Sequence, residues 1–131
     1  MFYTYLVLQL ALFLLALGGF FQVKQFLSQH DRITNARHLD NFKSLVRVNM
    51  YIALAYLALA APGILMSIYF GFTYGVYGTA FVIALNVPHF LFAKYLKVLE
   101  VKASHLDCST EYADEFRAIS ETWFKKALPN F

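Results

Sequence analysis

The chain has 131 residues, of which 60% are hydrophobic and 15% are charged, and its net charge is +3. This composition predicts an integral membrane protein with a few spans and a small polar appendage. The single cysteine, Cys108, excludes an intramolecular disulfide and a metal site built from several cysteines. The distribution of the basic residues along the chain is explained by the expected membrane topology, so we do not predict a nucleic-acid partner.

Residues 1–22 are predicted to form the first transmembrane helix. Residues 2–21 contain no charged side chain, and neither a basic segment before them nor a small-residue cleavage site after them indicates a signal peptide. Apolar residues continue at helical spacing to about His30, so the helix is expected to extend past the bilayer surface. One face combines small residues with Gln9 and is predicted to contact other helices. Its members are Tyr5, Gln9, Leu12, Ala16 and Gly19.

Residues 23–48 are predicted to be a cytoplasmic connection with helical extensions. The segment 31–40 is polar, and Thr34-Asn35 is the expected break between helices. A new helix is expected to begin near Asp40 and to continue directly into the membrane.

Residues 49–96 predict a transmembrane hairpin of two helices. Each half holds about 20 residues without a charge, which is enough to cross about 30 Å of hydrocarbon. Three glycines and several aromatic residues in 69–78 predict the reversal, around Phe72–Thr73. Pro62 and Pro88 are expected to kink the two helices. Two seven-residue repeats predict the facing sides. They are Phe42, Val46, Asn49, Ala53, Tyr56, Ala60, Gly63 and Ser67, and Gly75, Thr79, Val82, Asn86, His89 and Ala93.

The distribution of Lys and Arg predicts three spans with the N-terminus outside. Five of the eleven basic residues lie in 22–48, the other six follow residue 93, and neither the N-terminus nor the 69–78 turn carries any. With three spans, all eleven fall on one side of the membrane, and the positive-inside rule makes this side cytoplasmic. We therefore expect a bacterial inner (plasma) membrane protein with a cytoplasmic C-terminus.

Residues 97–131 are predicted to be a cytoplasmic tail with one amphipathic helix. The third helix is expected to extend to about Leu106, and Ser109 or Thr110 to cap a helix that ends before Pro129. Acidic residues dominate the polar face, which disfavours anionic lipid and favours a protein partner. The predicted docking residues on the apolar face are Tyr112, Phe116, Ile119 and Trp123.

Few polar side chains lie deep in the predicted spans, and these are the candidate site residues. Such groups either hold helices together or serve a function. The set predicted for helix packing is Gln9, Tyr56, Gly63, Asn86 and His89. The hairpin is expected to bring Tyr56 within hydrogen-bond reach of His89 and to place Gly63 opposite Val82.

The fold class is therefore an all-α membrane protein with three transmembrane helices and a C-terminal cytoplasmic amphipathic helix. We expect a non-catalytic subunit that packs in a larger membrane complex, or with copies of itself, and docks partners through its tail. No catalytic residues, metal site or cofactor are predicted, because no nucleophile–base pair, ligand cluster or phosphate loop can be assembled. Bound lipid is expected.

Two alternatives remain open from the sequence. The first is a small homo-oligomeric channel or transport element lined by Thr79, Asn86 and His89. The second is a haem- or quinone-type membrane anchor of a redox enzyme, in which His89 would bind the cofactor. Residues 37–40 resemble a motif of the haem-binding, three-span membrane anchors of succinate dehydrogenases. There the motif lies late in the second span, whereas here it follows the first and places His38 outside the membrane.

Overall fold

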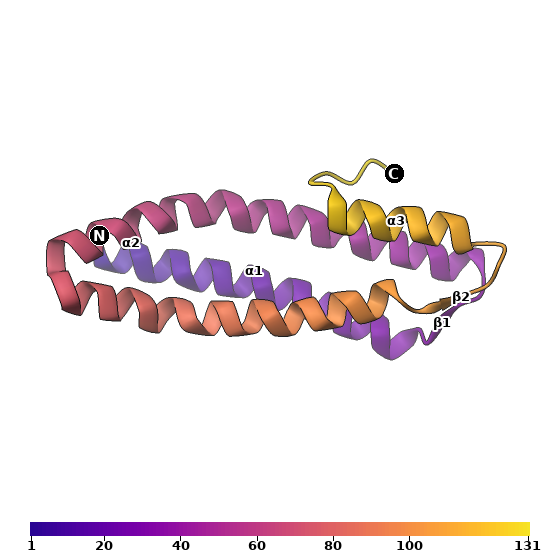
Figure 1. Ribbon diagram of the computed structural model, residues 1–131, viewed down its shortest axis with the longest axis horizontal. Coiled ribbons are helices and arrows are strands. Elements are labelled where there is room, and N and C mark those ends of the chain that lie inside the picture. The colour runs from indigo at the N-terminus through magenta and orange to yellow at the C-terminus, as the bar shows by residue number, and fades with distance from the viewer.

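The computed structural model describes residues 1–131 and consists of three helices, two strands of two residues each and short connecting segments. Figure 1 shows an elongated molecule in which the long helices lie side by side. In chain order the elements are α1 (Phe2–Gln29), β1 (Arg32–Ile33), α2 (Ala36–Ser104), β2 (Asp107–Cys108) and α3 (Ala113–Lys125). Two helices, α1 and α2, are long and apolar enough to cross a membrane.

Helix α2 folds back on itself and so forms two arms, residues 36–74 and 76–104 (Figure 1). Gly75 alone departs from helical geometry, with φ 59° and ψ −130°, a conformation open to glycine because it has no Cβ. At Gly78 the arms come so close that a Cβ would collide with the carbonyl of Phe70. The reversal thus lies slightly later than the expected Phe72–Thr73.

Both prolines of α2 lie within its arms. Pro62 and Pro88 are flanked by residues with helical φ and ψ, so neither ends its helix. Asn35 caps the start of α2 by accepting a hydrogen bond from the His38 N–H, at 2.9 Å. Helix α2 therefore begins four residues before the expected Asp40, at the break predicted for residues 34–35.

Helix α1 lies against both arms of α2, and its buried face follows the predicted repeat. Tyr5, Gln9, Leu12 and Gly19 are buried, and Val23 and Phe26 continue the same face to the end of the helix. The opposite faces of the helices carry large apolar side chains that remain exposed, among them Leu10, Leu57 and Phe90. Only 23 of the 131 residues are buried, so most of the apolar surface lies on the outside of the molecule.

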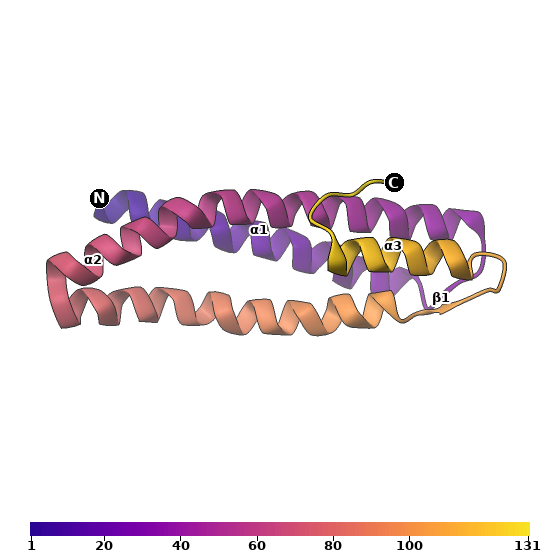
Figure 2. The same cartoon turned by 45° about the horizontal axis from the view of Figure 1, so that its top comes forward.

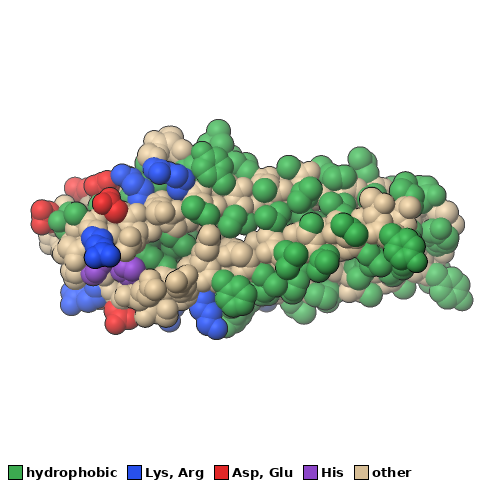
Figure 3. Space-filling view, turned by 180° about the vertical axis from the view of Figure 1, so that it is seen from behind, with side chains coloured by type: hydrophobic (Ala, Val, Ile, Leu, Met, Phe, Trp, Pro, Cys, Tyr) green, Lys and Arg blue, Asp and Glu red, His purple; other side chains and the backbone are tan.

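Charged and apolar surfaces are separated along the length of the molecule. Figure 3 shows charged and histidine side chains gathered at the end that carries the strands and α3, and hydrophobic side chains over the remainder. We call these the polar end and the apolar end. The turn at Gly75 lies at the tip of the apolar end (Figures 1 and 2).

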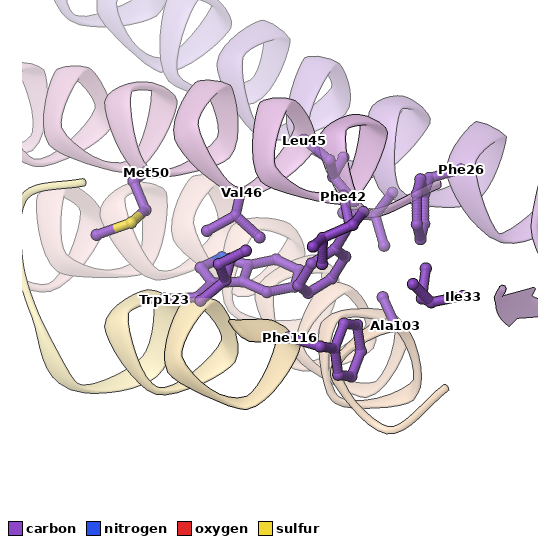
Figure 4. Packing of buried hydrophobic residues seen from close by; sticks show 12 residues of the cluster. Phe26, Ile33, Phe42, Leu45, Val46, Met50, Ala103, Phe116 and Trp123 are labelled. Carbon is purple, nitrogen blue, oxygen red and sulfur yellow. The ribbon is translucent and has the colours of Figure 1, made fainter. Parts of the chain in front are cut away.

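The polar end contains the main hydrophobic core. Figure 4 shows Phe116 and Trp123 of α3 directed toward Phe42 and Val46 of the first arm. Phe42 is fully buried, with its ring centroid 4.6 Å from that of Phe116 and 6.0 Å from that of Trp123. The twelve residues of this core are Val23, Phe26, Ile33, Leu39, Phe42, Leu45, Val46, Met50, Ala103, Phe116, Ile119 and Trp123.

A short parallel pairing closes the polar end. Strand β1 follows α1, β2 follows α2, and Arg32 pairs with Asp107 and Ile33 with Cys108. The Ser109 N–H and hydroxyl both donate to the Ile33 carbonyl, at 2.9 and 3.2 Å. The chain then enters α3, whose first residue is Ala113. Helix α3 thus begins a few residues after the expected caps Ser109 and Thr110, and its N-cap position is held by Tyr112 without a side-chain hydrogen bond.

Candidate functional site

A cavity of about 300 Å³ lies between the two arms of α2, with α1 as its third wall. We call it the inner cavity. Most of its lining is apolar, and four polar side chains enter it from the two arms. It is lined by Leu15, Ala16, Gly19, Asn49, Ile52, Ala53, Tyr56, Leu57, His89, Ala93, Leu96 and Glu100. An apolar cavity with a few convergent polar groups is typical of a small-molecule or lipid site.

Two predicted site residues, Tyr56 and His89, line the inner cavity from opposite arms. The structure contains no hydrogen bond between them, and His89 Nδ1 is buried without a partner. The His89 ring instead packs edge-on against Phe13, with centroids 5.8 Å apart. The predicted Tyr56–His89 hydrogen bond is therefore not formed. The later reversal at Gly75 supplies the reason, because it shifts the second arm along the first.

Asn86 takes part in a chain of hydrogen bonds that joins all three helical segments. Its Nδ2 donates to the Tyr5 hydroxyl at 3.1 Å and to the Val82 carbonyl at 2.8 Å. Tyr5 Oη lies 2.9 Å from Ser67 Oγ, and the Ser67 hydroxyl donates to the Gly63 carbonyl at 2.8 Å. Because the Ser67 proton is used there, Tyr5 must donate to Ser67. We call this chain of bonds the polar relay.

The polar relay crosses from the second arm through α1 to the first arm. Tyr5 is fully buried, and its ring also packs against Phe70 at 5.2 Å between centroids. Every hydroxyl and side-chain amide hydrogen of the polar relay has an acceptor. This avoids the free-energy cost of leaving polar groups unpaired in an apolar environment. The arrangement is therefore suited to holding helices together.

The remaining residues predicted for helix packing, Gln9 and Gly63, lie where α1 packs against α2. Gln9 is buried on α1, and its Oε1 has no hydrogen-bond partner. Gly63 is buried beside α1, where an added Cβ would lie 3.4 Å from Leu8 and 3.9 Å from Leu12. The expectation that Gly63 faces Val82 is thus wrong, because α1 lies against this part of the first arm.

The three residues of the channel alternative have different surroundings. Thr79 is exposed near the turn and donates a hydrogen bond to the Gly75 carbonyl at 3.0 Å. Asn86 belongs to the polar relay, whereas His89 lines the inner cavity.

The predicted docking stripe of α3 is covered by the same chain. Phe116, Ile119 and Trp123 are buried in the core of the polar end, and Tyr112 packs against that core. The exposed face formed by α3 and the turn before it is acidic instead. It carries Glu111, Asp114, Glu115, Arg117 and Glu121. Glu115 reaches Lys43 of the first arm at 3.2 Å, which ties α3 to α2 at its edge.

A second cavity of about 250 Å³ opens between α3 and the two arms. We call it the outer cavity. Its basic side chains are Lys97 and Lys126, and its aromatic side chains are Trp123 and Phe124. Lys97 Nζ lies 4.3 Å from the centroid of the Phe124 ring. Four residues line both cavities, so the two adjoin. They are Asn49, Ala53, Leu57 and Glu100.

Glu100 lies where the two cavities meet. Burial raises the pKa of its carboxyl group from the ordinary value of 4.5, and the neighbouring Lys97 partly opposes this rise. No ion pair compensates the carboxylate. Acidic side chains with a shifted pKa in a cavity are candidates for functional groups. Glu100 was not predicted as such a group from the sequence.

Two histidines of the polar end, His30 and His38, lie near each other, whereas His89 lines the inner cavity. His30 stacks on Phe26 at 4.6 Å between centroids and packs edge-on against His38 at 4.9 Å. His30 Nε2 also lies 3.2 Å from Asn41 Nδ2. These contacts join the end of α1 to the start of α2, and none of them reaches His89.

Sequence reasoning missed Tyr5, Ser67 and Glu100 as site residues. Tyr5 and Ser67 belong to the predicted helix-facing repeats, so their hydroxyl groups were a usable signal. Glu100 offered none, since its burial depends on how α3 and the arms pack. Comparisons of the chain with protein-family models, with curated proteins and with solved structures found no match.

Proposed function

We propose that this chain is a non-catalytic integral membrane subunit that packs in a larger membrane complex or with copies of itself. The observation that carries the proposal is the polar relay beneath an exposed apolar surface. The intramembrane polar groups Tyr5, Ser67 and Asn86 are used to bind the chain's own helices to one another. The exposed apolar side chains of α1 and α2 are left to contact lipid or neighbouring subunits.

The proposed topology has three spans, formed by α1 and by each arm of α2, with the N-terminus outside. The polar end, which carries the basic residues, then lies in the cytoplasm of a bacterial inner membrane. Single-cysteine labelling tests this topology on a Cys108→Ser background. An impermeant thiol reagent added outside intact cells is expected to label Thr73→Cys and to spare Asn35→Cys. Labelling of both from one side would remove a span.

Partner docking is proposed to use the exposed acidic face of α3, because the apolar stripe is already buried. Of the four acidic residues on this face, Glu111 and Asp114 form no ion pair within the chain. They are therefore free to meet a basic surface of a partner protein, which would favour association chiefly through its rate and specificity.

Co-purification from mild detergent, followed by mass spectrometry, tests the proposal. The wild-type chain is expected to retain specific membrane-protein partners, or to run as an oligomer of itself. Glu111→Lys with Asp114→Lys is expected to reduce the retention, whereas Lys125→Gln, on the last turn of the same helix, serves as the control. A wild-type chain that purifies as a monomer with no partner would contradict the proposal.

The channel alternative receives no support from these contacts. Asn86 is held in the polar relay, and the Thr79 hydroxyl is bonded to its own backbone. The amide hydrogens of Asn86 and the hydroxyl hydrogen of Thr79 are thus already bonded within the chain.

A further inference from the structure

The inner and outer cavities form one continuous groove, because they share Asn49, Ala53, Leu57 and Glu100. We call it the amphipathic groove. Its inner part lies between the two arms over α1 and is mostly apolar. Its outer part lies beside α3 and carries two lysines and two aromatic side chains. The groove is thus mostly apolar along its length, and its two lysines lie at the outer end.

The two lysines of the outer part are available for an anion. Lys97 and Lys126 are both exposed, and neither forms an ion pair with a carboxylate of the chain. Trp123 and Phe124 lie beside them, and aromatic rings of this kind favour the level of lipid headgroups. Basic pockets between helices on the cytoplasmic side of a membrane are typical sites for anionic lipid headgroups.

The length of the groove from Lys97 to His89 is comparable with the thickness of one leaflet of a bilayer. From Lys97 to His89 the second arm advances about 12 Å at 1.5 Å per residue. One leaflet contributes about 15 Å of the roughly 30 Å of hydrocarbon. An extended acyl chain whose headgroup lies near Lys97 would therefore end close to His89, within the groove.

We propose that the amphipathic groove binds one anionic phospholipid, with the phosphate between Lys97 and Lys126 and an acyl chain between the arms of α2. The charge of the two lysines selects the headgroup, and the apolar walls hold the chain. Glu100 faces the junction, and because burial raises its pKa, its carboxyl group opposes a nearby phosphate less than a fully ionised carboxylate would. The site rests on the proposed membrane insertion and goes beyond the packing role.

Native mass spectrometry of the full chain in mild detergent tests the headgroup. The probes are phosphatidylglycerol and phosphatidylcholine with identical acyl chains. We expect preferential retention of phosphatidylglycerol. Lys97→Gln and Lys126→Gln are each expected to weaken this retention about fivefold, the factor that corresponds to about 1 kcal/mol per basic residue near a membrane surface. Lys125→Gln is the matched control, since Lys125 does not line the outer cavity and lies 4.0 Å from Glu121.

A second variant tests the acyl-chain site without changing charge. Ala53 lines both cavities, so Ala53→Leu narrows the groove where they meet and is expected to reduce binding of both lipids. Ala55→Leu is its control, because Ala55 is exposed on the same arm and lines neither cavity. Circular dichroism of each variant verifies that the helices are intact.

Three outcomes would overturn the proposal. They are equal retention of the two lipids, retention that ignores both lysine variants, and co-purification of a different amphiphile, such as a quinone, that Ala53→Leu displaces. The proposed subunit role is measured separately by cysteine labelling and partner retention. A chain that inserts and keeps its partners but does not distinguish the lipids would therefore lose the lipid site alone.

Discussion

The two ends of this molecule are held together by different forces. At the polar end, twelve apolar side chains pack around Phe42, as in the core of a small water-soluble helical protein. At the apolar end, the few buried residues include Tyr5, Gly63 and Gly78, and the helices are joined by the polar relay. Where water surrounds a chain, burying apolar surface stabilises it. In lipid this gain disappears, and close packing and hydrogen bonds remain.

Removing a large side chain from the polar-end core is expected to have the largest effect. Phe42→Ala should cost about 3–5 kcal/mol, because Phe42 is fully buried against Phe116 and Trp123. Trp123 fluorescence during urea unfolding in detergent reports the loss. Phe72→Ala is the control, since Phe72 is exposed near the turn and should leave the midpoint nearly unchanged. Equal effects of the two changes would refute the contrast between the ends.

The turn of the apolar end is expected to be the next most sensitive point. Gly75→Ala should destabilise the hairpin by about 1–3 kcal/mol, because its positive φ is strained for any residue with a Cβ. Gly18→Ala should instead be neutral or stabilising, since Gly18 is helical and nothing lies within 4 Å of its added Cβ. Thermal unfolding in detergent compares them. A neutral Gly75→Ala would show that the turn has another conformation.

Breaking the polar relay is expected to cost less than either change. Tyr5→Phe removes the hydroxyl that joins Asn86 to Ser67, at about 0.6 kcal/mol for each intramembrane hydrogen bond. A double-mutant cycle with Asn86→Ala should give a coupling energy of similar size. Tyr3→Phe is the control, because Tyr3 is exposed on the same helix. Additive effects would mean that the relay does not form.

The smallest expected effect depends on pH and lies at the boundary between the two ends. The pKa of Glu100 is raised in the folded chain. The contribution of this carboxyl group to the free energy of unfolding is therefore fully present below about pH 4.5 and is lost as the pH rises through the pKa of the folded chain. Glu100→Gln should therefore raise the midpoint of thermal unfolding near pH 8 relative to the wild-type chain, and the difference should vanish in acid.

The exposed Glu111→Gln is the matched control for Glu100→Gln, and its midpoint should follow that of the wild-type chain at both pH values. A loss of stability near pH 8 in Glu100→Gln would show that attraction to Lys97, and not burial, dominates at Glu100.

Several local features could be predicted because they depend on residues close together in the sequence. The buried face of α1, the break near Asn35 and the extension of α2 beyond the apolar segment all follow from spacing and charge. The reversal was placed slightly early, since glycines at 71, 75 and 78 all permit a turn and only packing selects Gly75. Tyr56 and His89 still line the same cavity, but the predicted hydrogen bond between them is not formed.

By itself, the sequence determined an all-helical chain with long apolar helices and one charged end, because periodicity, length and charge are local properties. Only the tertiary structure decided what covers the stripe of α3, since Phe116 and Trp123 would fit a partner's surface as well as their own chain's Phe42. It likewise decided that Tyr5 joins Asn86 to Ser67 and that Glu100 is half-buried where the two cavities meet. These depend on which faces of three helical segments meet, and that choice is made by packing among residues far apart in the chain.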